Sequence, residues 1–138
     1  MKSQRILTWS ILLVLLLSQT VPLPGLAPKV AHAASYCDWA GFIADVSVPD
    51  GTKFNPGETF TKTWRLKNIG TCKWTTAYDL VFVSGDKLGA PSAVDLPSEV
   101  APGKTIDISV NMTAPSSSGR YRGNWQLRNA AGVLFGIG

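Results

Sequence analysis

Side chains that could perform acid–base, nucleophilic or metal chemistry are scarce in this sequence. The 138 residues contain one histidine, His32, and two cysteines, Cys37 and Cys72. His32 lies in an N-terminal segment that we expect to be removed, and the remaining chain then has no histidine. The absence of histidine rules out Ser-His and Cys-His catalysis and histidine-ligated metal sites in that chain. We therefore expect no catalytic residues, no metal and no cofactor.

The carboxylates are spread along the chain rather than clustered. A retaining glycosidase needs two carboxyl groups about 5 Å apart in a cleft, and no segment indicates such a cleft. Asp50 precedes Gly51, and Asp86 follows Ser84 and Gly85, which is typical of turns. The sequence also has no EF-hand spacing and no glycine-rich phosphate loop. These observations argue against a hydrolase and favour a protein that is not an enzyme.

The N-terminal segment, residues 1–33, is organised as an export signal. Lys2 and Arg5 precede an apolar run at 6–17, and a proline-containing stretch then ends in Ala-His-Ala at 31–33. Small residues at the last and third-last positions suit signal peptidase. The apolar run of about 12 residues is shorter than the roughly 20 residues of a spanning helix. We predict a cleaved signal peptide and a secreted or cell-envelope location; an uncleaved anchor is the alternative, and the only route to a membrane.

Export would bring the two cysteines into an oxidising compartment. Two cysteines in a small exported domain usually pair. A bridge between Cys37 and Cys72 would close a loop of about 36 residues and stabilise the fold by roughly 3–4 kcal/mol on the chain-entropy model. Two free buried thiols are the alternative.

The net charge of the whole chain, +4, is concentrated before residue 34. From Ala34 onward ten Lys or Arg residues stand against nine Asp or Glu, a balance near +1. Nucleic-acid binders carry a dense cationic face. The sequence therefore predicts no nucleic-acid partner.

The remainder of the chain shows apolar residues with period two rather than 3.6. The runs 59–68, 78–83, 106–113 and 120–128 alternate in this way, and glycine and proline separate them. Period-two alternation is typical of half-buried strands. Six to seven short strands in about 100 residues indicate an all-β, immunoglobulin-like antiparallel β-sandwich. Tyr121 stands where such folds often place a tyrosine corner.

A series of short motifs follows in a fixed order through this region. They are Val-Pro-Asp-Gly-Thr at 48–52, Pro-Gly at 56–57, Thr-Trp-Arg-Leu-Lys-Asn at 63–68, Gly-Thr-Cys-Lys-Trp at 70–74, Leu-Pro at 96–97, Ala-Pro-Gly at 101–103, Gly-Arg-Tyr-Arg-Gly-Asn-Trp at 119–125 and Leu-Arg-Asn at 127–129. Together they resemble the four-tryptophan (FW) immunoglobulin-like domain, the central domain of the next-to-BRCA-one protein. The resemblance covers roughly residues 42–138. It implies a β-sandwich of about seven strands without catalytic machinery.

The resemblance also implies a domain organisation. Residues 34–41 form a lead-in that carries Cys37, and 42–138 form the FW domain. Three of the four signature tryptophans correspond to positions in this chain, and Tyr121 completes the expected signature core: Trp64, Trp74, Tyr121 and Trp125. The fourth tryptophan should follow Phe135-Gly136, so we expect an incomplete last strand.

Six residues are candidates for a binding surface. They are Trp39, Trp74, Arg65, Arg120, Arg122 and Arg128. Trp74 follows a cysteine in a loop and packs on the disulfide or lies at a binding rim. Trp39 packs beside the bridge or stacks on a sugar ring. The arginines form a solvated sheet face or a shallow cationic surface for acidic partners. Trp64 and Trp125, on apolar strand faces, are expected in the core.

The resemblance favours a protein as the ligand. In eukaryotic members the domain lies inside selective-autophagy cargo receptors and binds protein partners, whereas bacterial members are often exported. We expect an exported, non-enzymatic protein-binding module. A carbohydrate-binding module is the alternative, because exported β-sandwiches with loop aromatics often bind sugars, and a fragment of a longer exported protein is a third reading.

Overall fold

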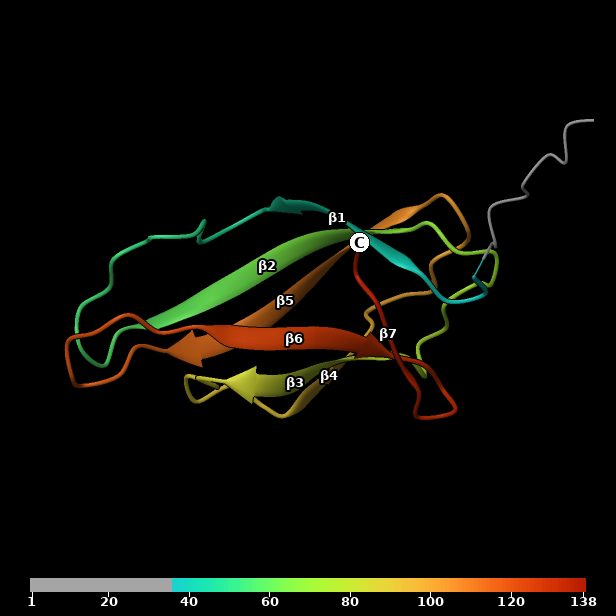
Figure 1. Cartoon of the computed structure of the whole chain (residues 1–138). Helices are drawn as coiled ribbons and strands as arrows, with labels where there is room; N and C mark the ends of the chain where they lie inside the picture. The colour runs from blue at the N-terminus through green and yellow to red at the C-terminus, as the bar shows by residue number, and fades with distance from the viewer. Residues whose placement is uncertain (1–35) are drawn as a thin grey trace, which may run out of the picture. The chain divides into compact units, whose positions relative to one another are not determined.

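The computed structural model describes residues 36–138, and the predicted signal peptide lies outside these residues. Seven strands follow one another: β1 (Ala40–Asp45), β2 (Thr59–Asn68), β3 (Asp79–Gly85), β4 (Ala93–Asp95), β5 (Thr105–Thr113), β6 (Gly123–Arg128) and β7 (Leu134–Phe135). They form two antiparallel sheets, ordered β1-β2-β5 and β4-β3-β6-β7 (Figure 1). The predicted all-β, immunoglobulin-like sandwich of six to seven strands is confirmed. β1 begins at Ala40, inside the segment predicted as a lead-in.

The pairing of β2 with β5 is the longest in the fold and follows the sequence pattern closely. The register runs without interruption from Thr59 opposite Thr113 to Lys67 opposite Thr105. Along β5, Ile106, Ile108 and the next two even-numbered residues are buried and the odd-numbered ones exposed. Alternation of this kind places one face of a strand on the core and the other in solvent.

The strand predicted at 120–128 is shorter than expected, because β6 begins at Gly123. Tyr121 therefore lies in the preceding loop and remains 39% exposed. Its assignment to the signature core is wrong. Its hydroxyl donates to the Ser117 carbonyl at 2.8 Å, which is the local contact of a tyrosine corner. Tyr121 thus makes a hydrogen bond within its own loop instead of packing in the core.

The C-terminal segment joins the two sheets. β7 pairs with β6 through Phe135 opposite Leu127. The chain then crosses to β1, where Ala40 N donates to Gly136 O at 3.1 Å and Gly138 N donates to Ala40 O at 2.8 Å. This contact runs parallel to β1.

The core lies between the sheets and is mostly aliphatic, with one tryptophan at its centre. Trp74, Ile108 and Leu127 are fully buried. Trp64 and Trp125 are partly buried against this core, with ring centroids 6.0 Å apart. Their predicted place on the inner strand faces agrees with this arrangement.

Candidate functional site

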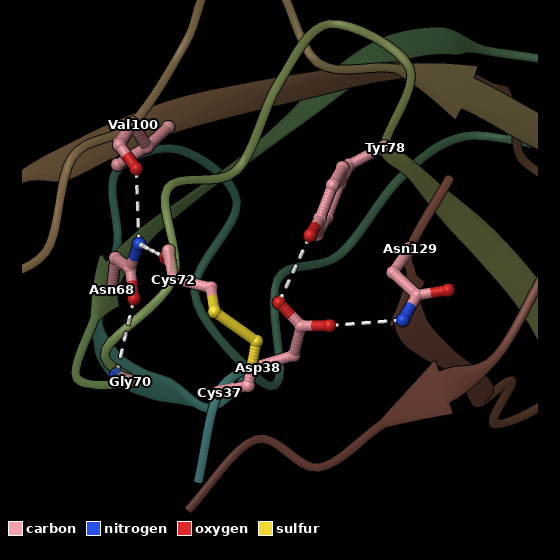
Figure 2. Close-up of a disulfide and its surroundings, with 8 residues drawn as sticks. All are labelled: Cys37, Asp38, Asn68, Gly70, Cys72, Tyr78, Val100 and Asn129. Carbon is pink, nitrogen blue, oxygen red and sulfur yellow. Dashed lines mark hydrogen bonds between the residues drawn. A yellow bond between two sulfur atoms is a disulfide. The ribbon is translucent and has the colours of Figure 1, made fainter. Parts of the chain in front are cut away.

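The disulfide anchors the N-terminal lead-in to the domain. Cys37 and Cys72 are bonded at a sequence separation of 35 residues (Figure 2). The prediction of a bridge is confirmed, and the alternative of two free thiols is excluded. Because Cys72 follows β2 in the chain, the bridge fixes residues before β1 to the loop that leaves β2.

Backbone contacts reinforce the bridge on both sides. Cys72 N donates to Cys37 O at 2.9 Å, and Gly70 N donates to Trp39 O at 3.1 Å. A Cβ on Gly70 would lie 2.8 Å from Trp39 N and would also clash with the Cys37 carbonyl. Only glycine permits this approach of the two backbone segments.

Asp38 connects the lead-in to two further elements. Its carboxylate accepts from the Tyr78 hydroxyl at 3.0 Å and from Asn129 Nδ2 at 2.9 Å (Figure 2). Burial, and then the hydrogen bond and charge of Asp38, raise the pKa of Tyr78 above its ordinary value. Sequence reasoning missed this network, because the three residues are far apart in the chain and only the fold brings them together.

A fully buried amide supports the loop that carries Cys72. Asn68 Nδ2 donates to the carbonyls of Cys72 at 2.8 Å and Val100 at 2.9 Å, and Asn68 Oδ1 accepts from Gly70 N at 3.0 Å. Three satisfied bonds offset the cost of burying the amide. In the sequence, this local bond is indicated only by an asparagine two residues before a glycine, Asn68 before Gly70.

Three apolar residues lie on neighbouring backbone segments beside the disulfide, and we call them the lead-in patch: Tyr36, Trp39 and Ile69. Tyr36 is 59% exposed and Ile69 49% exposed. Tyr36 stacks on Trp39 with ring centroids 5.0 Å apart, and Ile69 N donates to Trp39 O at 3.0 Å. The Trp39 ring lies against Gly136, where an added Cβ would be 2.8 Å from it. The patch is therefore held by the bridge, by backbone bonds and by the C-terminal segment.

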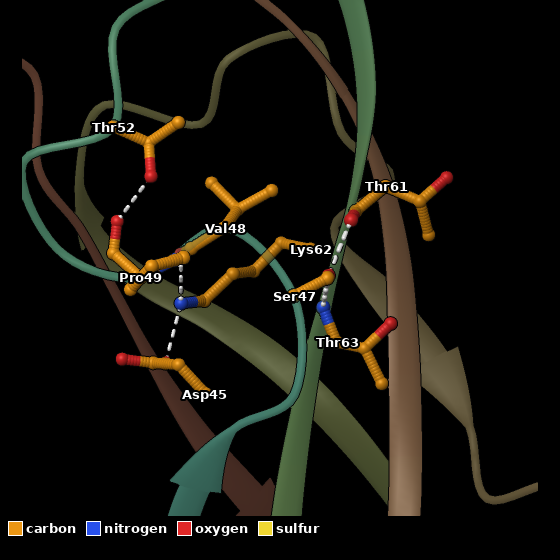
Figure 3. Close-up of polar contacts among 8 residues, drawn as sticks. All are labelled: Asp45, Ser47, Val48, Pro49, Thr52, Thr61, Lys62 and Thr63. Carbon is orange, nitrogen blue, oxygen red and sulfur yellow. Dashed lines mark hydrogen bonds and ion pairs between the residues drawn. The ribbon is translucent and has the colours of Figure 1, made fainter.

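A second polar cluster lies around Lys62 (Figure 3). Lys62 is only 7% exposed; its ammonium pairs with Asp45 and donates to the Val48 carbonyl at 2.7 Å. The ammonium also lies 5.4 Å from the centre of the Trp64 ring. Lys62 lies on the same face of β2 as Trp64 and Leu66, and the ion pair explains how a lysine occupies that face.

Trp74 is not a surface residue. It is 0% exposed and packs against Phe135 with ring centroids 5.6 Å apart. Its place among the candidate binding residues is wrong, since its side chain lies in the hydrophobic core and its backbone exchanges two hydrogen bonds with Val100. Among residues 36–138, the buried Nε1 of Trp74 finds no hydrogen-bond partner.

The four candidate arginines do not form one surface. Arg65 donates two bonds to Asp107, at 2.7 and 2.8 Å, on the exposed side of the three-stranded sheet. This guanidinium holds the pKa of Asp107 below its ordinary value. Arg128, on the other sheet, is paired with Asp79 at 2.5 Å. Arg120 and Arg122 are exposed in the loop before β6.

Residues 36–138 contain no group of three or more His, Cys, Asp or Glu side chains arranged to hold a metal ion. In the same part of the chain no helix is long and apolar enough to cross a membrane.

Comparison with known proteins agrees with the motif order. The family described as "Ig-like domain from next to BRCA1 gene" matches residues 47–137. The chain belongs to this family. The next-to-BRCA1 family match includes Cys72 but begins after Cys37, so the disulfide ties a segment outside the matched range to the family domain.

Several relatives share this domain. The chain is 42% identical over 98 residues to Protein JOKA2 of Solanum tuberosum, covering 69% of this chain and 11% of that protein. It is 37% identical over 95 residues to Protein ILRUN of Danio rerio, covering 69% and 33%. It is 36% identical over 99 residues to Next to BRCA1 gene 1 protein of Homo sapiens, covering 70% and 10%. The chain thus spans between a tenth and a third of these relatives.

Proposed function

We propose that this chain is an exported, non-enzymatic binding module whose ligand is a protein. The lead-in patch is the observation that carries the proposal. Exposed apolar residues gathered on one face mark interaction sites, and aromatic residues are enriched in protein interfaces. The bridge and the backbone bonds fix the patch, so little conformational entropy is lost when a ligand binds.

The composition of the patch favours a protein over a polysaccharide. Sugar rings stack on free aromatic faces, but one face of Trp39 is turned toward Tyr36. The third member, Ile69, is aliphatic. Trp74, the other tryptophan considered for sugar stacking, is fully buried. Within the lead-in patch, Tyr36 is the most exposed aromatic ring, and one of its faces is turned toward Trp39.

Export is supported by two independent features. The first is the signal-like pattern of residues 1–33. The second is the Cys37–Cys72 bridge, because disulfides persist in oxidising compartments. N-terminal sequencing of the protein recovered outside the cytoplasm should begin at Ala34. Protein retained in the cytoplasm with residues 1–33 intact and both thiols free would contradict export.

The binding proposal is tested by comparing two exposed aliphatic positions. The full-length chain is immobilised, proteins of the host envelope and medium are passed over it, and each retained protein is purified and titrated by calorimetry. Ile69→Glu should weaken binding at least tenfold, whereas Val83→Glu on β3, 45% exposed in the native chain, should leave it unchanged.

Circular dichroism and an intact disulfide would show that both variants are folded. Equal weakening by both substitutions, or none by Ile69→Glu, would count against the lead-in patch. Retention on cell-surface polysaccharide that depends on Tyr36, together with no protein ligand, would replace the proposal with the carbohydrate alternative.

A further inference from the structure

The outer edge of β5 is a long strand edge without a partner strand in residues 36–138. β5 has nine residues and pairs only with β2; Figure 1 shows these two strands running side by side. The other strands at sheet edges differ: β1 is bonded on its outer side by Gly136 and Gly138, β4 has three residues and β7 has two. β5 is therefore the longest strand edge that is open to another strand.

The hydrogen-bond pattern shows which backbone groups point outward. Asn68 N donates to Lys104 O at 2.9 Å, so in this regular ladder the even-numbered residues of β5 bond to β2. In an antiparallel pair the residues between them direct both N–H and C=O away from the partner. At Thr113 the outward N–H donates to Leu88 O at 2.7 Å. Asp107, Ser109 and Asn111 have no such partner in the part of the chain that the structure describes.

The usual protections of a sheet edge are missing from β5. Natural edge strands are blunted by proline, by lysine, by a bulge or by shortness. β5 contains neither proline nor lysine, and its register with β2 shows no bulge. Its one charged residue, Asp107, is already paired with Arg65.

We infer that β5 pairs antiparallel with β5 of a second copy of this chain, about a two-fold axis through Ser109. The three open residues would then exchange about six backbone hydrogen bonds, two at each pair of opposed residues. The two three-stranded sheets would become one sheet of six strands. Such an interface is isologous and closes at two subunits.

The side chains along the edge are self-complementary in this arrangement. Ser109 lies opposite Ser109 of the second copy, and Asp107 lies opposite Asn111. Asn111 accepts from Thr61 through Oδ1, which leaves its Nδ2 donor for the opposing carboxylate. No like charges stand directly opposite one another, a situation that would destabilise a strand pair.

A turn lies beside one end of β5 and a depression beside the other. The Leu88–Gly89 turn lies beside Thr113, as the Thr113–Leu88 bond shows. A depression lined by Pro97 and Ser98 lies beside Thr105. The two-fold axis brings the turn of one copy to the depression of the other.

Cysteine cross-linking in the full-length chain tests this register. Ser109→Cys would place two thiols on directly opposed, hydrogen-bonded residues with Cα atoms about 5.5 Å apart, within disulfide range. Under mild oxidation we expect a dimer on a non-reducing gel. Thr105→Cys is the matched control, because it lies on the same exposed face of β5 but far from its symmetry mate, and it should remain monomeric on the gel.

A second variant tests the backbone contact itself. Ser109→Pro removes an outward N–H and the hydroxyl that is hydrogen-bonded to Thr63 Oγ1 at 2.8 Å, but no backbone donor of the β2–β5 ladder. By analytical ultracentrifugation the native chain should have the mass of a dimer and Ser109→Pro that of a monomer, with the Cys37–Cys72 bridge intact in both. A monomeric native chain, a dimer that persists in Ser109→Pro, or equal cross-linking at positions 105 and 109 would each overturn the inference.

Discussion

At the scale of single residues, stability depends on polar side chains that the sheets enclose. Lys62 occupies a position in β2 that the alternation assigns to the core. Its ion pair with Asp45 and its bond to the Val48 carbonyl hold the ammonium there. Burying a charge is costly unless it is paired and hydrogen-bonded. The pair therefore specifies how the segment after β1 packs on β2.

Lys62→Met should destabilise the protein by about 2–4 kcal/mol, because it leaves Asp45 without its partner. The double variant Asp45→Asn/Lys62→Met should recover most of that loss, since neither charge remains. Urea denaturation of the two variants and the native chain measures the difference. A double variant as unstable as the single one would show that packing, not charge, is decisive at this site.

Tyr78→Phe removes one donor to Asp38 and should cost about 1 kcal/mol at neutral pH. The raised pKa of Tyr78 adds a pH dependence. A phenol whose pKa is raised by folding contributes its full stability below its ordinary pKa of about 10 and loses it as the pH rises through the folded value. The free energy of unfolding of the native chain should fall above pH 10 more steeply than that of Tyr78→Phe. Parallel curves from pH 9 to pH 12 would contradict this assignment.

At the scale of elements, close backbone approach fixes the lead-in against the loop after β2. The Asn68 side chain and the Gly70 backbone form one unit with Cys37 and Trp39. The geometry requires glycine because the two main chains pass within contact distance of the missing Cβ.

Gly70→Ala should destabilise the domain by about 3 kcal/mol, since the backbone on either side must move to admit a methyl group. Gly41→Ala is the control: it lies in β1 beside the same segment, and its Cβ would meet only Ile69 at an ordinary 3.4 Å. Thermal melts of both variants provide the comparison. Similar melting temperatures for the two would mean that the Gly70 contact relaxes at little cost.

At the scale of the whole molecule, the disulfide joins the lead-in to a domain whose two sheets are formed by its own strands. The lead-in also accepts hydrogen bonds from Tyr78, directly before β3, and from Asn129 in the β6–β7 turn. The lead-in thus connects elements of both sheets.

Replacing both cysteines, Cys37→Ser/Cys72→Ser, should cost roughly 3–4 kcal/mol on the chain-entropy model for a loop of this length. The family domain, residues 47–137, retains its core, so unfolding should stay cooperative at a lower melting temperature. Calorimetry distinguishes this from the loss of any transition. An unchanged melting temperature would mean that the backbone bonds alone secure the lead-in.

The sequence by itself determined the strand alternation and the family, and it favoured a bridge between the two cysteines over free thiols. These follow from local rules: period two in β5 reflects the two faces of a strand, and two cysteines allow only one bridge if they pair. Family motifs also placed Trp64 and Trp125 between the sheets. Such features need only neighbouring residues or simple counting.

Only the tertiary structure decided where the loop residues lie. Trp74, a candidate for the binding surface, is buried, and Tyr121, expected in the core, is exposed. Both lie in loops, and a loop has no periodicity that indicates which side chains face the core. The lead-in patch, the Asp38 network and the open edge of β5 likewise depend on segments distant in sequence. Their contacts arise from the order of the strands in the sheets, and that order is set by packing across the whole domain rather than by any local pattern.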